Sequence, residues 1–475
     1  MQQFYALLWL SFALLGPSLL FAQPNRVYTS MRQALQAPEK VYQLDLEHKR
    51  LTELSPDIGK LKNLRVLELE DNRLTKLPEE IWQLTKLTRL DLDQNRLTEI
   101  SSEIGQLNQL TELDLDDNKI TALPASIGNL TELTTLDIAD NRLESLPESL
   151  GKLKKLTALH LENNKLTQLP TSIGNLKQLT LLNLNDNQLQ QLPPSFGQLK
   201  NLTKCPLFNN QLTQLPKSFG NLDQLTILAL YNNQLEQLPA SIGKLYRLTN
   251  IQLDTNQLQQ LPKEIAQLSN LVNLSACNNN LTQLPNQLGN LKNLQALVLE
   301  KNQITALPNS IGDLESLMRL ELDSNAIQSL PTTLFNLPHL DKLDLEFNQI
   351  KTIPKEVGQL TTLTYLDFNA NALTQVPSSI SSLKDVEYFS LSNNQIKRLP
   401  KEIGELSRLQ SLTLANNPIS SLPENILNCS LLSTLTLEET KIPSFQRKLL
   451  EHWARTHVRP PAPPEPISPW DGYGD

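Results

Sequence analysis

The 475-residue sequence has few cysteines and histidines and no excess of positive charge. Its three cysteines, Cys205, Cys277 and Cys429, and its five histidines lack the spacing of a disulfide framework or a zinc cluster. The 42 Lys and Arg residues are outnumbered by 50 Asp and Glu residues, which gives a formal charge of −8. Binding to nucleic acid needs excess cations to neutralise phosphates. The composition therefore disfavours a nucleic-acid partner, and any charged partner is expected to be basic.

Catalytic and metal-binding motifs are also missing. The sequence holds no GxSxG, no HExxH and no phosphate-binding glycine loop. Runs that begin at Asp91 and Asp114 resemble the opening of a calcium loop, but both lack Gly at the sixth position and Glu at the twelfth. We predict that the protein is not an enzyme and has no catalytic residues, cofactor or metal site. Paired carboxylates leave a calcium site between strands as an alternative.

One long apolar run lies at the amino terminus. Residues 4–15 carry no charge, Gly16-Pro17 breaks any helix, and Ala22 offers a small residue for cleavage. This pattern predicts a signal peptide over residues 1–22 and export to the periplasm, the cell surface or the medium. An uncleaved membrane anchor is the alternative. No other stretch is long and apolar enough to span a membrane after cleavage.

A 23-residue unit repeats without insertion from Val41 to Thr440. Two consecutive copies read LRVLELEDNRLTKLPEEIWQLTK (64–86) and LTRLDLDQNRLTEISSEIGQLNQ (87–109). A fixed period in this range predicts a solenoid of stacked repeats. With Val41 as the first position, every repeat except the two terminal ones has Asn at the ninth: Asn72, Asn95, Asn118, Asn141, Asn164, Asn187, Asn210, Asn233, Asn256, Asn279, Asn302, Asn325, Asn348, Asn371, Asn394 and Asn417.

The constant positions of the repeat have separate physical roles. Leucines at the first, fourth and sixth positions fit a short strand that faces the core, and those at the eleventh, fourteenth and twenty-first line the return path. An Asn side chain has both a carbonyl and an amide, so a stacked row can satisfy backbone groups in the turn. Pro at the fifteenth position prevents the strand from continuing and fixes an extended return segment. Glycine, from Gly59 to Gly404, falls at the nineteenth position and predicts a backbone turn there.

The pattern LxxLxLxxNxLxxLPxxIGxL resembles the typical leucine-rich repeat. It is closest to the class found in Ras-associated scaffolds, plant intracellular Ras-group proteins and many bacterial proteins. The resemblance covers residues 41–440 and implies an α/β fold, a horseshoe-shaped solenoid whose concave face is a parallel β-sheet of about 18 repeats. It also implies that the concave face binds protein.

Both ends of a solenoid need a cover for the exposed core. We predict an N-terminal cap at 23–40, with a short helix capped by Ser30 and ended by Pro38. We predict a helical C-terminal cap at 441–459 and a disordered, Pro-rich tail at 460–475. In the C-terminal helix Ser444 is the expected cap, and the residues expected on its packed side are Phe445, Leu449, Leu450 and Trp453.

Function in a solenoid depends on its variable positions, here the third, fifth, seventh and eighth, which are expected to face the concave side. In the first five repeats these positions are acidic, with Arg89 as their one cation. A basic partner is one interpretation, and a solvated face is the other. This acidic segment consists of Asp45, Glu47, Glu68, Glu70, Asp71, Asp91, Asp93, Glu112, Asp114, Asp116, Asp117, Asp137 and Asp140. Its predicted partner-binding residues are Asp91, Asp93, Asp114 and Asp116.

Two further regions of the same face carry candidate partner-binding residues. The middle patch holds Leu181, Phe208, Ile227, Ala229 and Tyr231, with Phe208 and Tyr231 as stacked neighbours; neutral drift is the alternative. A mixed patch follows, with the candidates Arg319, Lys342, Tyr365 and Tyr388, together with Phe347, Glu321, Asp323, Asp344, Glu346 and Asp367.

The eighth repeat departs from the pattern. Cys205 replaces a core leucine and Pro206 removes a strand donor, so a local flaw in the sheet is expected. Cys429 also occupies a core position, and Cys277 an outward one, so no disulfide is predicted.

Together these observations predict a non-enzymatic scaffold that presents its concave face to a protein partner, as scaffolds in signalling do. One alternative is a surface adhesin or glycan-binding protein. Another is a secreted effector resembling the bacterial ubiquitin ligases with leucine-rich repeats, although only 35 residues follow Thr440, too few for a separate catalytic domain. Oligomeric state is left open.

Overall fold

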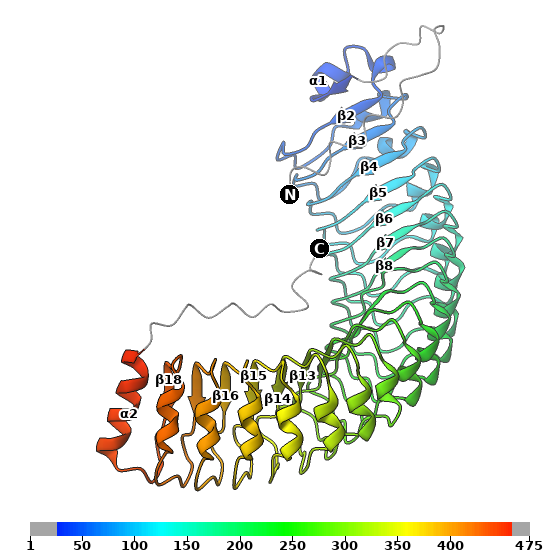
Figure 1. Cartoon of the computed structure of the whole chain (residues 1–475). Helices are drawn as coiled ribbons and strands as arrows, with labels where there is room; N and C mark the ends of the chain where they lie inside the picture. The colour runs from blue at the N-terminus through cyan, green and yellow to red at the C-terminus, as the bar shows by residue number, and fades with distance from the viewer. Residues whose placement is uncertain (1–25, 458–475) are drawn as a thin grey trace, which may run out of the picture.

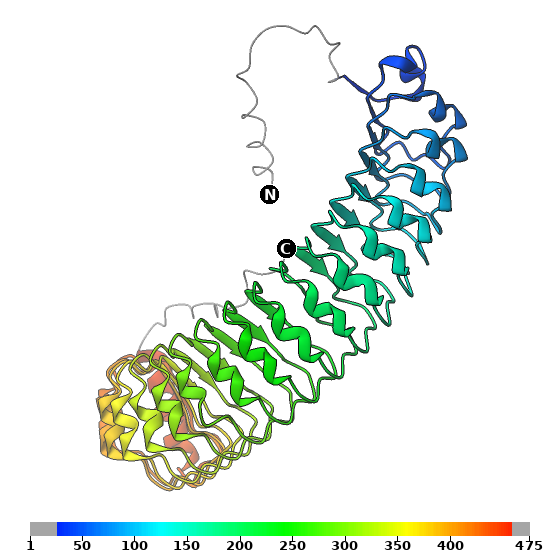
Figure 2. The same cartoon turned by 90° about the vertical axis from the view of Figure 1, so that its right-hand side faces the viewer.

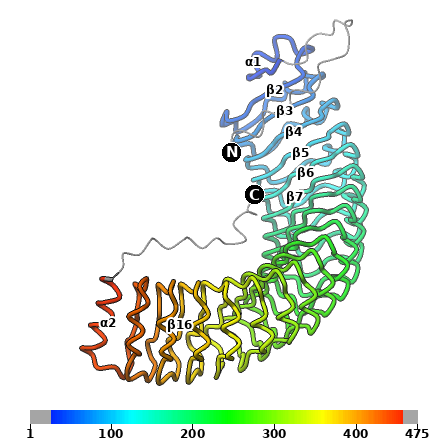
Figure 3. The backbone as a smooth tube through the Cα atoms, in the orientation of Figure 1, coloured from blue at the N-terminus to red at the C-terminus, as the bar shows by residue number. Residues whose placement is uncertain are grey.

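The computed structural model describes residues 26–457, which form one curved solenoid. Strands line the inner side of the arc and short helices line the outer side (Figures 1 and 2). The backbone trace shows the same coil repeated from end to end (Figure 3). The predicted signal peptide and the Pro-rich tail lie outside the described residues. From residue 26 to 457, no helix combines the length and apolar character that a membrane crossing requires.

Parallel strands and two α-helices make up the inner side and the ends. The α-helices are α1 (Met31–Ala34) and α2 (Ser444–His457). The strands are β1 (Val27–Tyr28), β2 (Gln43–Asp45), β3 (Val66–Glu68), β4 (Arg89–Asp91), β5 (Glu112–Asp114), β6 (Thr135–Asp137), β7 (Ala158–His160), β8 (Leu181–Asn183), β9 (Ile227–Ala229), β10 (Asn250–Gln252), β11 (Asn273–Ser275), β12 (Ala296–Val298), β13 (Arg319–Glu321), β14 (Lys342–Asp344), β15 (Tyr365–Asp367), β16 (Tyr388–Ser390), β17 (Ser411–Thr413) and β18 (Thr434–Thr436).

Short 3₁₀ helices form the outer side, and most begin directly after the proline at the fifteenth position. Pro239, for example, has φ −69° and ψ 145°, the extended conformation expected there. The helices are η1 (Pro38–Lys40), η2 (Pro56–Lys60), η3 (Glu79–Gln83), η4 (Ser102–Gln106), η5 (Ala125–Asn129), η6 (Glu148–Lys152), η7 (Thr171–Asn175), η8 (Pro194–Gln198), η9 (Lys217–Asn221), η10 (Ala240–Lys244), η11 (Lys263–Gln267), η12 (Leu288–Asn290), η13 (Asn309–Asp313), η14 (Thr332–Asn336), η15 (Lys355–Gln359), η16 (Ser378–Ser382), η17 (Lys401–Glu405) and η18 (Glu424–Asn428).

The asparagine row performs the role predicted for it. The side-chain amide of Asn233 donates to the Leu207 and Leu230 carbonyls at 3.0 and 3.1 Å. Its side-chain carbonyl accepts from the Leu212 N–H at 3.0 Å. The amide and carbonyl of Asn256 make the equivalent bonds one repeat later. The row therefore joins consecutive repeats inside a core of fully buried leucines and satisfies the backbone of the turn.

The glycine column is needed for close packing, and the predicted backbone turn is wrong. No glycine among residues 26–457 has positive φ. A Cβ added to Gly220 would lie 2.0 Å from the Ser241 carbonyl oxygen of the next repeat. Glycine here lets consecutive 3₁₀ helices approach each other more closely than a side chain allows, although buried Trp82 and Phe335 occupy the same column in η3 and η14. Leu427 replaces the glycine in the last repeat that has such a helix, where none follows.

The expected flaw at the eighth repeat divides the sheet in two. Strands β1 to β8 form one sheet, and β9 to β18 form the other. Between them an isolated bridge joins Lys204 to Leu181, and backbone hydrogen bonds outside the strands continue the contact, such as the one from the Leu184 N–H to the Pro206 carbonyl at 3.1 Å. The Leu207 N–H still donates to the Ala229 carbonyl at 3.1 Å. Because Pro206 lacks an N–H, the single continuous sheet that we predicted is interrupted at this point.

The N-terminal cap largely follows the prediction. The Ser30 side chain accepts from the Gln33 N–H at 3.3 Å and caps α1. Strand β1 pairs with β2 and extends the sheet by one strand beyond the repeats. Pro38 was expected to end the helix, but α1 already ends at Ala34 and Pro38 begins η1.

The C-terminal helix is rotated from the predicted orientation. Leu450 and Trp453 pack against the core together with buried Ala454, whereas Phe445 and Leu449 are 77% and 58% exposed. The Glu451 carboxylate accepts from the Leu437 N–H at 3.2 Å and so satisfies a backbone group at the end of the sheet. Ser444 is the first residue of α2 and does not act as its predicted cap.

The three cysteines are free. Cys205 and Cys429 are buried, as predicted for residues at core leucine positions. Burial raises the pKa of the Cys429 thiol to about 11. Cys277 is half-buried on the inner side, where burial and the nearby Asp254 raise its thiol pKa to about 12.

Candidate functional site

The parallel register arranges the variable side chains of the inner face in columns. Asp91 pairs with Asp114, and Asp114 with Asp137, so the fifth-position residues of neighbouring strands lie side by side. The eighth position begins the turn after each strand with a left-handed backbone: Asp117 has φ 42° and Phe347 has φ 50°. Asp and Asn tolerate this conformation, which explains much of their frequency at the eighth position.

Arg89 neutralises one part of the acidic segment. Its guanidinium lies 3.1 Å from Asp91, 3.7 Å from Glu112 and 4.0 Å from Glu68. Asp91 is only 5% exposed, so its charge depends on this contact. Arg89 therefore binds its immediate neighbours and leaves the adjoining repeats without a cation.

Those adjoining carboxylates are held close together in partly dry surroundings. Burial, followed by the charges of Asp137 and its neighbours, raises the pKa of Asp114 to about 7. The same causes raise the pKa of Asp116 to about 7, and burial and Asp91 raise that of Asp93 to about 6. A cationic partner would lower these pKa values, because it would stabilise the ionised forms.

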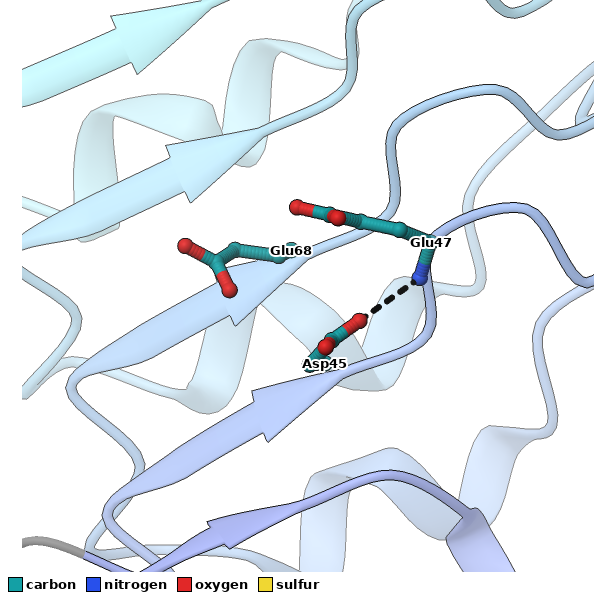
Figure 4. A group of neighbouring side chains, drawn as sticks. All are labelled: Asp45, Glu47 and Glu68. Atoms are coloured by element: carbon teal, nitrogen blue, oxygen red, sulfur yellow. Dashed lines mark hydrogen bonds between the residues drawn. The ribbon is translucent and has the colours of Figure 1, made fainter. Parts of the chain in front are cut away.

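A second group of carboxylates lies at the start of the sheet (Figure 4). Oxygen atoms of Asp45, Glu47 and Glu68 lie within 4.8 Å of one another, and Asp45 accepts from the Glu47 backbone N–H at 3.0 Å. Asp344, Glu346 and Asp367 form a similar group in the mixed patch. Both groups offer oxygen atoms of the kind that bind hard cations. Neither has a further feature of a metal site.

The middle patch contains the predicted aromatic stack. The rings of Phe208 and Tyr231 lie 4.5 Å apart at an interplanar angle of 8°. Both side chains are half-buried on the inner face. Leu181 and Ile227 lie in β8 and β9 on either side of Lys204, so these two side chains are separated by one repeat. The stack therefore lies where the two sheets meet.

Ion pairs connect the cations of the mixed patch to its acids. Arg319 makes a close ion pair with Glu321, and Lys342 lies 3.2 Å from the same carboxylate. Glu321 is 3% exposed, so the two cations balance the charge of a carboxylate that is almost fully buried. The Lys342 ammonium also lies 4.8 Å from the centre of the Tyr365 ring.

Two tyrosines continue this network. The rings of Tyr365 and Tyr388 are 4.4 Å apart and nearly parallel. Both hydroxyls donate to the same carboxylate oxygen of Asp367 at 3.3 Å, and the Asn369 N–H donates to the other oxygen at 2.6 Å. Burial raises the tyrosine pKa values above their ordinary range. Arg319, Lys342, Tyr365 and Tyr388 thus form a continuous row across β13 to β16.

Our sequence analysis missed two features of the inner face and its edge. His160 lies 3.7 Å from Glu162 and 4.0 Å from Asp137, and its pKa is raised by the hydrogen bond to Glu162. The sequence contained a signal for this contact, because His160 occupies the fifth position of its repeat, one repeat after Asp137. The second feature is a row of cations at the tenth position, a position that we had not treated as variable.

Comparisons with known proteins agree with this architecture. Family models match at residues 39–97 and 361–419 (leucine rich repeat), 98–166 and 274–346 (leucine-rich repeat region) and 178–199 (leucine rich repeat). A solved leucine-rich repeat protein from Leptospira interrogans is 38% identical, with a TM-score of 0.63, and the match covers 86% of this chain and 99% of that one.

More distant matches include a plant receptor and a chain of an insect complex. The plant peptide hormone receptor RGFR1, solved in complex with RGF2, is 28% identical over 85% of this chain and 79% of its own, with a TM-score of 0.52. A chain of the Toll–Spatzle complex from Drosophila is 25% identical over 83% of this chain and 53% of its own, with a TM-score of 0.62. A comparison with curated protein sequences finds no match.

Fold and surface together define a repeat solenoid with an extended, chemically varied inner face. The matches to the repeat models cover more than half of the sequence. The chain belongs to the leucine-rich repeat family.

Proposed function

We propose that this protein is a non-enzymatic scaffold whose concave face binds a protein partner. The observation that carries the proposal is the Phe208–Tyr231 stack, two aromatic side chains held in parallel on the inner face. Large aromatic side chains provide much of the binding energy of protein interfaces. The related receptor RGFR1 was solved with a bound RGF2, which supports a role in binding protein or peptide.

We further propose that the acidic segment orients a basic region of the same partner. Its carboxylates outnumber the one Arg89 cation, and those of Asp114 and Asp116 have no counter-charge within 4.0 Å among the described residues. Complementary charge speeds encounter and fixes orientation more than it adds affinity. Binding should therefore combine an aromatic anchor in the middle with salt-sensitive steering from the amino-terminal repeats.

Export, signalling and a basic partner belong to this proposal as well. The apolar run over residues 4–15 supports export. Export would place the concave face in the periplasm, at the cell surface or in the medium. The resemblance of the repeat to that of Ras-associated scaffolds supports a role in signalling, with protein contacts on this face.

The test is crosslinking capture from cell-surface extracts with residues 23–475. Wild type is compared with a Phe208→Ala, Tyr231→Ala variant and with a matched Tyr246→Ala, Phe445→Ala control, which removes two exposed aromatic residues outside the inner face. We expect a protein that wild type and control capture and the stack variant loses. Equal capture by all three would reject the stack as the anchor.

A salt series separates the two parts of the proposal. Raising the salt from about 0.05 M to about 0.5 M should weaken capture if the acidic segment steers a basic partner, because screening shortens the range of its field. If capture depends on the aromatic stack but does not change with salt, the two rings are more consistent with stacking on a sugar. That result would favour the adhesin or glycan-binding alternative.

A further inference from the structure

A row of exposed cations runs along the edge of the inner face in the first six repeats. It occupies the tenth position, which directly follows the asparagine of the turn in every repeat of the row except the first. In the later repeats this position is uncharged until Lys441. The four repeats directly after the row have glutamine there: Gln188, Gln211, Gln234 and Gln257. The cation row consists of Arg50, Arg73, Arg96, Lys119, Arg142 and Lys165.

Backbone hydrogen bonds fix the spacing of the cation row. The Arg73 N–H donates to the Leu51 carbonyl of the preceding repeat at 2.8 Å, and the Arg96 N–H to Leu74 at 2.9 Å. Lys119, Arg142 and Lys165 continue the same pattern. Successive cations therefore recur at about one strand spacing, ~4.8 Å.

The cation row has no counter-charge in direct contact. Among residues 26–457, none of its six side chains lies within 4.0 Å of a carboxylate; the one ion pair beside it joins His48 to Asp71 at 2.8 Å. Its nearest acids in sequence are Asp71, Asp117 and Asp140, each two residues before a cation, and Glu144, two residues after Arg142. Like charges at this spacing repel one another, so an anionic ligand would relieve a cost that the fold imposes.

A polar hollow lies at the start of the row. It has a volume of about 420 Å³ and is lined by His48, Arg50, Asp71, Asn72, Arg73 and Arg96. Three arginines of the cation row thus face one shared space. No apolar side chain lines it, so it lacks the anchor that most protein partners need.

We propose that the cation row binds a linear, sulfated polysaccharide. A sugar unit is close in length to one strand spacing, so anionic groups along such a chain can stay in register with the cations. An extended acidic peptide presents side chains on one face only every ~6.7 Å and loses register within a few repeats. This site is separate from the aromatic stack and does not depend on the proposed protein partner.

The experiment measures binding of fluorescently labelled heparin to residues 23–475 across a salt series. The row variant is Arg73→Gln, Arg96→Gln, Lys119→Gln, because glutamine is the residue that later repeats use at the same position. The charge-matched control is Lys355→Gln, Lys397→Gln, Lys401→Gln, three exposed lysines elsewhere on the solenoid. A gain variant, Gln188→Arg, Gln211→Arg, lengthens the row.

We expect the row variant to bind at least tenfold more weakly, and the slope of log affinity against log salt to fall by about 2 to 3. The control should bind like wild type, and the gain variant more tightly. Equal losses in the row variant and the control would overturn the proposal, since binding would then follow net charge alone.

One competition arm tests the class of ligand, and one further variant tests the location of the site. Unlabelled polyglutamate that competes as well as heparin at equal charge would reject the polysaccharide and favour an acidic protein segment. Binding of the Phe208→Ala, Tyr231→Ala variant should be unchanged. A loss of heparin binding in this variant would contradict a separate binding site, because it would place heparin on the inner face.

Discussion

The acidic segment and the mixed patch occupy the same columns of the inner face but balance their charges differently. In the mixed patch, Glu321 is nearly buried and two cations share its charge. In the acidic segment, Arg89 lies within 4.0 Å of three carboxylates, and the next repeats have no Lys or Arg of their own on this face. The comparison shows that a shared column fixes neither burial nor charge balance: Asp114 is half-buried and Glu321 is buried, and the neighbouring repeats decide whether the charge is compensated.

This difference separates two energetic roles. A network in which cations balance the buried carboxylates needs no ligand and helps to fix the shape of the surface. A network without such cations stays electrostatically unfavourable until a ligand supplies positive charge. Burial and neighbouring carboxylates raise the pKa values of Asp114 and Asp116 to about 7, and burial and Asp367 raise the pKa of Asp344 in the mixed patch to about 7 as well. Substitutions that remove cations should therefore harm the mixed patch, and substitutions that remove acids should help the acidic segment.

The largest expected effect is on the mixed patch. Replacing Arg319 and Lys342 with Met leaves the Glu321 carboxylate buried without a cation, which should cost about 3 kcal/mol of local stability. Hydrogen exchange of the β13 and β14 amides measures this loss. Adding Glu321→Gln to the same variant should restore most of the protection. If protection stays low in the triple variant, lost packing of the two long side chains is the cause instead.

A smaller effect of opposite sign is expected in the acidic segment. An Asp whose pKa is raised in the folded state binds its proton more tightly there than when unfolded, so stability falls as pH rises from about 4 to about 7. The Asp114→Asn, Asp116→Asn variant should therefore be more stable than wild type at pH 8, on the order of 1 kcal/mol after allowance for solvent screening.

Urea unfolding at pH 8 and at pH 4 measures this difference. The gain should be largest at pH 8 and much smaller at pH 4, where both carboxyl groups are protonated in the folded state and partly protonated in the unfolded state. A gain that is equal at both pH values would mean that the amide side chains act through hydrogen bonding, and the electrostatic explanation would be wrong.

The sequence predicts the periodic part of this molecule well, because each repeat poses the same packing problem. The asparagine ladder, the Phe208–Tyr231 stack and the flaw at Pro206 all follow from counting positions in a fixed frame. Contacts between side chains do not follow from the frame. That Asp367 accepts from both tyrosines depends on rotamers that spacing leaves free.

The C-terminal helix was predicted less well, because its side-chain contacts do not follow from the repeat frame either. Repeats constrain a side chain from both sides, whereas α2 has a repeat on one side only. A helical pattern allowed either Phe445 or Leu450 to face the core. The unpaired backbone at the last turn, which the Glu451 carboxylate satisfies at the Leu437 N–H, contributes to that choice, and it is not visible in a count of apolar residues.

The smallest expected effect concerns the junction that separates the two compared regions. Pro206→Val supplies the missing N–H and should extend pairing between β8 and the eighth repeat, with a gain of about 0.5 to 1.5 kcal/mol, the usual net value of one hydrogen bond. Amide exchange at Leu182 and Leu184 should slow accordingly, while exchange in β4 and β14 stays unchanged. If the flaw gives the stack its position, the same substitution should also weaken capture of the partner by Phe208 and Tyr231. A stabilised junction with undiminished capture would show that the interruption of the sheet has no part in binding.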